Sequence, residues 1–258
     1  MKIVLILLAA VCAWAQAPLS SPPLGFVRDA EGGIRAVTGV AGNFILGEPA
    51  GSAVLSAAFS SSAGLLKTAS SLIAVDSASH IVSTHEAPGG PALFSLLAGP
   101  SALVYFPASQ SLYRWRSGKL RPLPFDPTSL AGTALSVAET GPDGAEFLVQ
   151  RADGLWLIEI ELKNGSSGSA QAIPGATSPA LLLADGSLLF GDGKDLVLRL
   201  ANQSELRYPL GAAADFLEPM TGGWIHVRAR NRLEFALRLP AQDGGRLYAL
   251  PAPPSIGQ

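Results

Sequence analysis

Short apolar segments that alternate with polar residues recur along almost the whole chain. Residues 154–162 and 224–230 have a hydrophobic period of two, whereas no window keeps apolar residues at i, i+3, i+4 and i+7 for three turns. Dipeptides that favour tight turns, such as Asp153-Gly154 and Asp185-Gly186, separate the segments. This pattern predicts an all-β chain of short antiparallel strands joined by hairpins.

The predicted strands repeat in groups of four. Equivalent apolar residues in the last strand of each group recur about every 42 residues, a spacing typical of propeller blades. They are Ile81, Leu120, Ile173, Leu206 and Leu247. A sheet with apolar residues on both faces needs neighbours to cover it, and a ring of sheets provides them. We therefore predict a β-propeller of five to six four-stranded antiparallel blades, with full blades at about residues 52–88, 91–125, 131–175, 178–211 and 212–251.

A predicted hairpin at residues 24–40 precedes the first full group and leaves the number of blades open. Either the ring has six positions and this hairpin supplies the outer strands of an incomplete blade, or the ring has five blades and the hairpin is annexed to it. We favour the arrangement with six positions.

The first 15 residues have the features of a secretory signal peptide. A basic start is followed by an apolar run at residues 3–11 and by the cleavage pattern Ala13-Trp14-Ala15. The run is far shorter than the roughly 20 residues that a membrane-spanning helix needs. We therefore predict that residues 1–15 are removed and that residues 16–258 form a single propeller domain. The mature chain would be periplasmic or extracellular, with no integral membrane segment.

The cysteine content and the net charge restrict the covalent links and the kinds of partner that are expected. The only cysteine, Cys12, lies in the predicted signal peptide, so the mature chain would form no disulfide. Val11 precedes it where a lipoprotein signal has glycine or alanine, so no lipid anchor is expected. The formal net charge is −2 and only 15% of residues are charged. A nucleic-acid partner is therefore disfavoured, because it would require a basic surface.

Two stretches resemble a known group of proteins. The chain reads GFVRDAEGGIRAVTGVAGNFILGEP from Gly25 and ends with RLEFALRLPAQDGGRLYALPAP. With the repeats between them, these stretches are similar to a group of secreted, uncharacterised bacterial β-propeller proteins. The resemblance implies a propeller and export and supplies no reaction. The Gly-His and Trp-Asp signatures of WD-type repeats are absent, so adaptor functions of that family do not carry over.

Signatures of catalysis and metal binding are scarce. The chain has no Gly-x-Ser-x-Gly elbow, and the mature chain would have no cysteine nucleophile. His80 and His85 are an odd number of residues apart on one predicted strand, which places them on opposite faces. The stretch at residues 192–195 fits a hairpin turn better than a calcium loop, since Lys194 would bring a positive charge into the cage. We predict neither a metal nor a cofactor.

The strand at residues 224–230 offers the best candidate binding residues. Alternation places an aromatic ring, an imidazole and two guanidinium groups on one face, where they could bind an anionic sugar or a carboxylate. The other interpretation is a set of ion pairs between blades, with partners such as Glu218 or Glu234. A tryptophan between two arginines on another strand allows the same two interpretations. The candidates are Trp224, His226, Arg228, Arg230 and Trp115.

These observations favour an exported, non-enzymatic binding or interaction module whose partner is a protein or a cell-envelope polymer. The alternative is a propeller hydrolase or lactonase that acts on a sugar-like compound through the central channel. That alternative requires at least two acidic or histidine side chains to meet in the channel. A propeller that has lost its site is a third possibility, which the sequence does not separate from the first.

Overall fold

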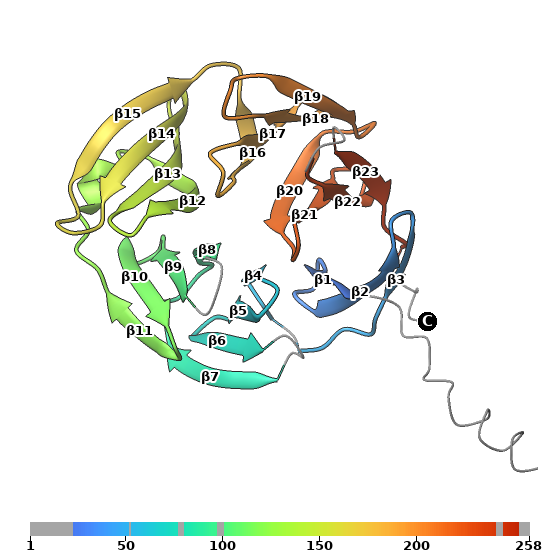
Figure 1. Cartoon of the computed structure of the whole chain (residues 1–258), viewed down its shortest axis with the longest axis horizontal. Helices are drawn as coiled ribbons and strands as arrows, with labels where there is room; N and C mark the ends of the chain where they lie inside the picture. The colour runs from blue at the N-terminus through green and yellow to red at the C-terminus, as the bar shows by residue number, and fades with distance from the viewer. Residues whose placement is uncertain (1–22, 52, 77–79, 97–100, 241–244, 253–258) are drawn as a thin grey trace, which may run out of the picture.

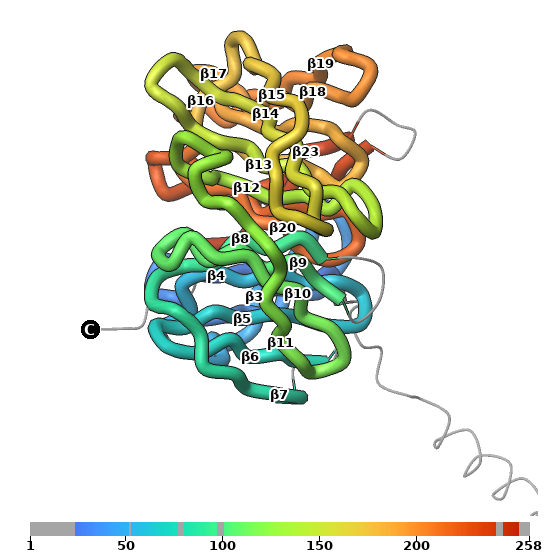
Figure 2. The backbone as a smooth tube through the Cα atoms, turned by 90° about the vertical axis from the view of Figure 1, so that its left-hand side faces the viewer, coloured from blue at the N-terminus to red at the C-terminus, as the bar shows by residue number. Residues whose placement is uncertain are grey.

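The chain forms a ring of six antiparallel sheets around a central axis, so the predicted β-propeller is confirmed (Figure 1). The computed structural model describes residues 23–51, 53–76, 80–96, 101–240 and 245–252. The predicted signal peptide and Cys12 lie outside these residues. Figure 2 views the ring from its edge, with β12–β19 above β4–β11. No helix in the described ranges has the length and apolar character needed to span a bilayer.

In the part of the chain that the structure describes, five blades have four strands and one has three. Blade 1 contains β1 (Pro23–Arg28), β2 (Ile34–Val40) and β3 (Asn43–Leu46). Blade 2 contains β4 (Ser56–Phe59), β5 (Ala63–Lys67), β6 (Ser71–Asp76) and β7 (Ile81–Glu86). Blade 3 contains β8 (Leu93–Leu96), β9 (Ser101–Phe106), β10 (Ser111–Arg116) and β11 (Lys119–Pro122).

The second half of the ring repeats the four-strand unit. Blade 4 contains β12 (Thr133–Gly141), β13 (Gly144–Arg151), β14 (Gly154–Glu161) and β15 (Ser167–Ile173). Blade 5 contains β16 (Thr177–Leu182), β17 (Leu188–Asp192), β18 (Asp195–Arg199) and β19 (Glu205–Pro209). Blade 6 contains β20 (Ala214–Pro219), β21 (Trp224–Ala229), β22 (Glu234–Arg238) and β23 (Arg246–Ala249). A short 3-10 helix (Pro127–Ser129) connects blades 3 and 4.

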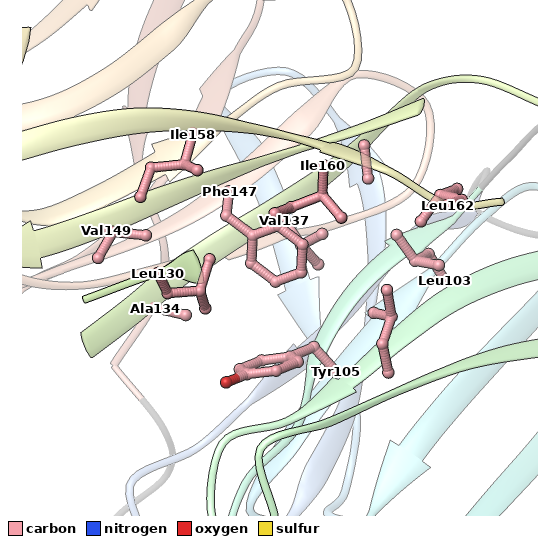
Figure 3. Packing of buried hydrophobic residues seen from close by; sticks show 12 residues of the cluster. Leu103, Tyr105, Leu130, Ala134, Val137, Phe147, Val149, Ile158, Ile160 and Leu162 are labelled. Atoms are coloured by element: carbon pink, nitrogen blue, oxygen red, sulfur yellow. The ribbon is translucent and has the colours of Figure 1, made fainter. Parts of the chain in front are cut away.

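The core is divided among the spaces between neighbouring blades. Between blades 3 and 4, Leu103 and Tyr105 of β9 pack against Phe147 of β13 and Ile160 of β14 (Figure 3). The rings of Tyr105 and Phe147 are 5.2 Å apart and nearly perpendicular. Each blade therefore buries apolar side chains on a neighbour rather than within itself, which is the physical reason for the ring.

Blade 1 differs from the others in the direction of its innermost strand. The five strands β4, β8, β12, β16 and β20 all run from one end of the axial channel to the other, since their early residues line one end and their later residues line the opposite end. β1 runs in the reverse direction. Thr221, which follows β20, donates to the Leu24 carbonyl at 2.7 Å, whereas Glu218, within β20, pairs with Arg28 at the far end of β1.

This reversal assigns the strands of blade 1 to the outer positions of a blade. Phe44 of β3 packs edge to face on Tyr248 of β23, the outermost strand of blade 6, with ring centroids 6.0 Å apart. β1, β2 and β3 thus occupy the second, third and outermost positions, and none of the described residues forms an innermost strand there. The ring has six positions, and the predicted hairpin belongs to the incomplete blade.

Blades 2 and 6 meet at the innermost position of blade 1, where no described residue forms a strand. The backbone N–H of Ala57 in β4 donates to Glu218 Oε1 in β20 at 3.1 Å, so the inner strands of blades 2 and 6 meet directly. Gly25 of β1 has a φ of +135°, and a Cβ there would lie 2.5 Å from Thr221 Oγ1. Only glycine accepts both the conformation and the close approach.

Candidate functional site in the axial channel

The candidate residues of β21 face blade 1 and have partners within the protein. Trp224 is buried against Phe44, with ring centroids 5.8 Å apart. His226 is fully buried, and its Nε2 lies 3.3 Å from Glu234 Oε2. Arg228 donates to Asp215 at 3.1 Å. The polar partners Glu234 and Asp215 both belong to blade 6, so these contacts lie within one blade and are not the ion pairs between blades of the second interpretation.

The other two candidates lie elsewhere. Arg230 is exposed and follows the end of β21, so it does not extend a continuous strip. Trp115 is buried between blades 2 and 3, and its indole N–H has no hydrogen-bond partner among the described residues. Neighbouring Arg114 donates to Glu139 of β12 at 2.8 Å. The structure therefore does not bring the five candidates together at one surface.

The histidines outside β21 do not meet either. His80 is exposed, with its Nδ1 3.2 Å from Asp76 Oδ2. His85 carries a buried Nε2 that has no partner among the described residues. Within the described ranges, no three histidine, cysteine, aspartate or glutamate side chains are grouped so that they could hold a metal ion.

Two cavities follow one another along the axis. The first, about 210 Å³, has the polar lining residues Arg28, Ser56, Ser136 and Glu218, and we name it the Arg28 cavity. The second, about 470 Å³, lies at the other end of the channel, and we name it the Trp224 cavity. Its lining is mostly apolar and includes Phe94, Leu96, Leu181, Leu183, Met220 and Trp224. Ala58, Phe94, Val137, Leu181 and Pro219 line both cavities, so the cavities are stacked in one channel.

Glu218 is the central ionisable group of the Arg28 cavity. Its Oε1 accepts from Arg28 Nε at 3.3 Å and from the Ala57 N–H. Burial raises the pKa of the Glu218 carboxyl above its usual 4.5, although Arg28, the Ala57 N–H and His226 each lower it. The neutral form of the carboxyl is therefore favoured over a wider range of pH than in water.

Arg28 is held in place by an aromatic ring. Its guanidinium carbon lies 4.8 Å from the centroid of Phe216, and that of Arg228 lies 4.9 Å from the same ring. Such stacking orients the planar group and leaves its edge free to donate. Only Arg28 Nε makes a hydrogen bond to the described residues, so the two terminal amino groups are unused.

Serine residues of the inner strands link consecutive blades. Ser56 Oγ accepts from the N–H of Ala92, Ser95 Oγ from that of Glu139, and Ser136 Oγ from that of Leu182, at 2.9, 2.9 and 3.1 Å. Each contact joins one blade to the next around the channel. Ser56 and Ser136 keep their own hydroxyl protons, which no described residue accepts.

The sequence named Glu218 only as an ion-pair partner of the strand at residues 224–230, and it did not indicate a site that contains Arg28, Ser56 and Ser136. Arg28 and Glu218 are 190 positions apart, and the stretch from Gly25 that contains Arg28 resembles a protein group without indicating a role for this residue. The serines have no distinctive local pattern beyond their place near the start of an inner strand. A search for equivalent positions across the repeats could have found Ser56, Ser95 and Ser136, because each lies in the first strand of a predicted blade.

Comparison with known proteins establishes the fold alone. Neither the protein-family models nor the curated proteins give a match. Among solved structures, the six-bladed fungal lectin of Aleuria aurantia, described with a fucose recognition mode, is similar at a TM-score of 0.54 and 16% identity, over 89% of this chain and 92% of the lectin. The WD40 propeller domain of Doa1 has a TM-score of 0.53 and 12% identity, over 86% of this chain and 94% of that domain.

A third similar structure is larger than this chain. PorZ, a surface component of the type-IX secretion system of Porphyromonas gingivalis, has a TM-score of 0.54 and 12% identity, over 90% of this chain and 39% of PorZ. The similar structures thus include a lectin, a WD40 domain and a secretion component. At these identities the shared feature is the propeller fold, which hosts many unrelated functions.

The two cavities differ in what they can do chemically. Each is lined by one acidic side chain, Glu218 in the Arg28 cavity and Asp185 in the Trp224 cavity, and by no described histidine. The converging pair of acids or histidines required by the hydrolase alternative is not found among these lining residues. The Arg28 cavity offers several hydrogen-bond donors, whereas the Trp224 cavity offers a mostly apolar surface.

Proposed function

We propose that this protein is an exported binding module that takes an apolar group of a protein partner into the Trp224 cavity. The observation that carries the proposal is this recess of about 470 Å³, with Leu183, Met220 and Trp224 in its wall. A third cavity, of about 370 Å³, shares Phe59 and Trp224 with the Trp224 cavity and extends beside β1. Together they form a large concave surface at one end of the ring.

The lining favours a protein over a polysaccharide as the partner. Burial of sugar hydroxyls against Leu181, Leu183 and Met220 would cost free energy because those side chains offer no hydrogen bonds. An apolar side chain loses no such bonds and gains from leaving water. Rigid blades would hold the recess open without reorganisation on binding, which reduces the entropic cost of association.

The turn between β4 and β5 provides a test with a matched control. Ser61 is exposed and lines both the Trp224 cavity and the third cavity beside β1, whereas its exposed neighbour Ser62 lines neither. Ser61→Trp should fill the mouth and abolish recovery of a partner by the tagged protein from envelope extract, while Ser62→Trp should not. The proposal fails if the same partner is recovered equally with both variants, or if none is recovered reproducibly with the native sequence.

Export is the second part of the proposal and has its own test. The basic, apolar and Ala-x-Ala segments of residues 1–15 support it. Expression of the tagged full chain in a bacterial host should place it outside the inner membrane, with an N-terminus at Gln16. A chain that stays in the cytoplasm with residues 1–15 attached would contradict export without affecting the binding proposal.

A further inference from the structure

The Arg28 cavity gathers hydrogen-bond donors that the fold leaves unused. Arg28 has five N–H groups and commits only Nε to Glu218. Ser56 and Ser136 accept from neighbouring blades but donate to no described residue. All three side chains line the same cavity of about 210 Å³. Unused donors around a cavity suit a ligand that is rich in acceptors.

Charge in the cavity favours an anion over a neutral acceptor. The ionisable side chains that line it are Arg28 and Glu218. Burial raises the pKa of the Glu218 carboxyl, so the arginine charge is less fully compensated than in an exposed pair. A single guanidinium matches one negative charge.

The remaining wall defines the rest of the ligand. Leu55, Leu93, Leu135 and Val137 line the cavity and offer no polar side-chain atoms. A ligand with a second charged group would lose solvation against these side chains without compensation. A short aliphatic chain would instead gain from burial. A volume of about 210 Å³ accommodates a chain of a few carbon atoms.

We infer that the Arg28 cavity binds a small monocarboxylate with a short apolar tail, its carboxylate on the terminal amino groups of Arg28 and the hydroxyls of Ser56 and Ser136. Arginine pairs with a carboxylate through two parallel hydrogen bonds, and Phe216 holds the guanidinium plane in place for this geometry. The site is distinct from the apolar Trp224 cavity and does not depend on its proposed role.

Calorimetric titration with butyrate tests the inference, with butyramide as the uncharged probe of nearly the same shape. Saturable binding of butyrate is expected, with butyramide at least about tenfold weaker because the charged hydrogen bonds are lost. Arg28→Gln should lower the affinity for butyrate by a similar factor. Equal binding of the two probes, absence of saturable butyrate binding, or unchanged affinity in a folded Arg28→Gln variant would overturn the proposal.

Leu55 gives a second pair of variants that does not disturb the interior. It is 37% exposed and lines the cavity. Leu55→Glu places a negative charge at the entrance and should lower the affinity for butyrate about fivefold relative to Leu55→Gln, which has a similar shape and no charge. Equal affinity of these two variants would also contradict an anion site, and this comparison does not require that Arg28→Gln fold.

Discussion

The interaction between Arg28 and Glu218 is the most consequential contact at the scale of single residues. It joins the first strand of the chain to the last blade and leaves a carboxyl almost completely buried beside the channel. A buried ion pair is poor support for stability, because desolvation of both groups opposes their attraction. Its position in a cavity with unused donors favours a role in binding over a role in stability.

The raised pKa of Glu218 predicts how stability depends on pH. Because the folded-state pKa lies above the usual 4.5, the unfolded state ionises first as pH rises. The contribution of this group to stability is therefore complete below pH 4.5 and is lost as pH rises through the folded-state pKa.

Denaturant unfolding at several pH values compares the native protein with Glu218→Gln, which keeps an acceptor for the Ala57 N–H but cannot ionise. The free energy of unfolding of the native protein should fall relative to that of the variant as pH rises from 4 to 8. The raised pKa would be contradicted if the free energy of unfolding of the native protein minus that of the variant stayed constant or increased as pH rises.

Strands show which parts of the pattern could be predicted. Residues 154–162 alternate in hydrophobicity and form β14, because alternation is a local consequence of the pleat. β3 (Asn43–Leu46) was not expected as a strand, since it lies outside the predicted hairpin and the recurring groups of four. The strand at residues 224–230 was predicted, yet the burial of Trp224 by blade 1 depends on which blades meet at the ends of the chain.

The serine contacts between inner strands predict a repeated stabilising role. Ser136→Ala would leave the buried N–H of Leu182 without an acceptor, and Ser95→Ala would do the same for Glu139. Each change should lower the free energy of unfolding by about 1–3 kcal/mol. Ser109→Ala, on an exposed turn, serves as the control. Chemical denaturation measures the free energy of unfolding of the three variants. Losses for Ser95→Ala and Ser136→Ala that equal the loss for Ser109→Ala would refute a stabilising role of these serines.

At the scale of the whole molecule, the described residues close the ring without a strand shared between the first and last blades. Blades 1 and 6 are joined by the packing of Phe44 on Trp224 and Tyr248, by the hydrogen bond from Thr221 to Leu24, and by the Arg28–Glu218 pair. Closure of the ring therefore depends on side-chain contacts at this seam.

Removal of the aromatic ring at the seam should destabilise the entire propeller. Phe44→Ala is expected to lower the free energy of unfolding by about 3–5 kcal/mol, the usual cost for a buried phenylalanine. Adjacent Ile45 is 55% exposed, so Ile45→Ala should change the free energy of unfolding by less than about 0.5 kcal/mol. Thermal unfolding followed by tryptophan fluorescence and by circular dichroism measures both variants. Equal melting temperatures would show that this seam does not limit stability.

The sequence by itself determined the all-β class, the four-strand repeat and the propeller ring, because alternation and turn chemistry act between residues that are close along the chain. It also predicts a signal peptide, which lies outside the described residues. Only the tertiary structure decided that no described residue supplies an innermost strand to blade 1, that Arg28 meets Glu218, and that two cavities of different chemistry share one channel. These features depend on strand direction and on which distant strands face each other, and short-range patterns carry no information about either.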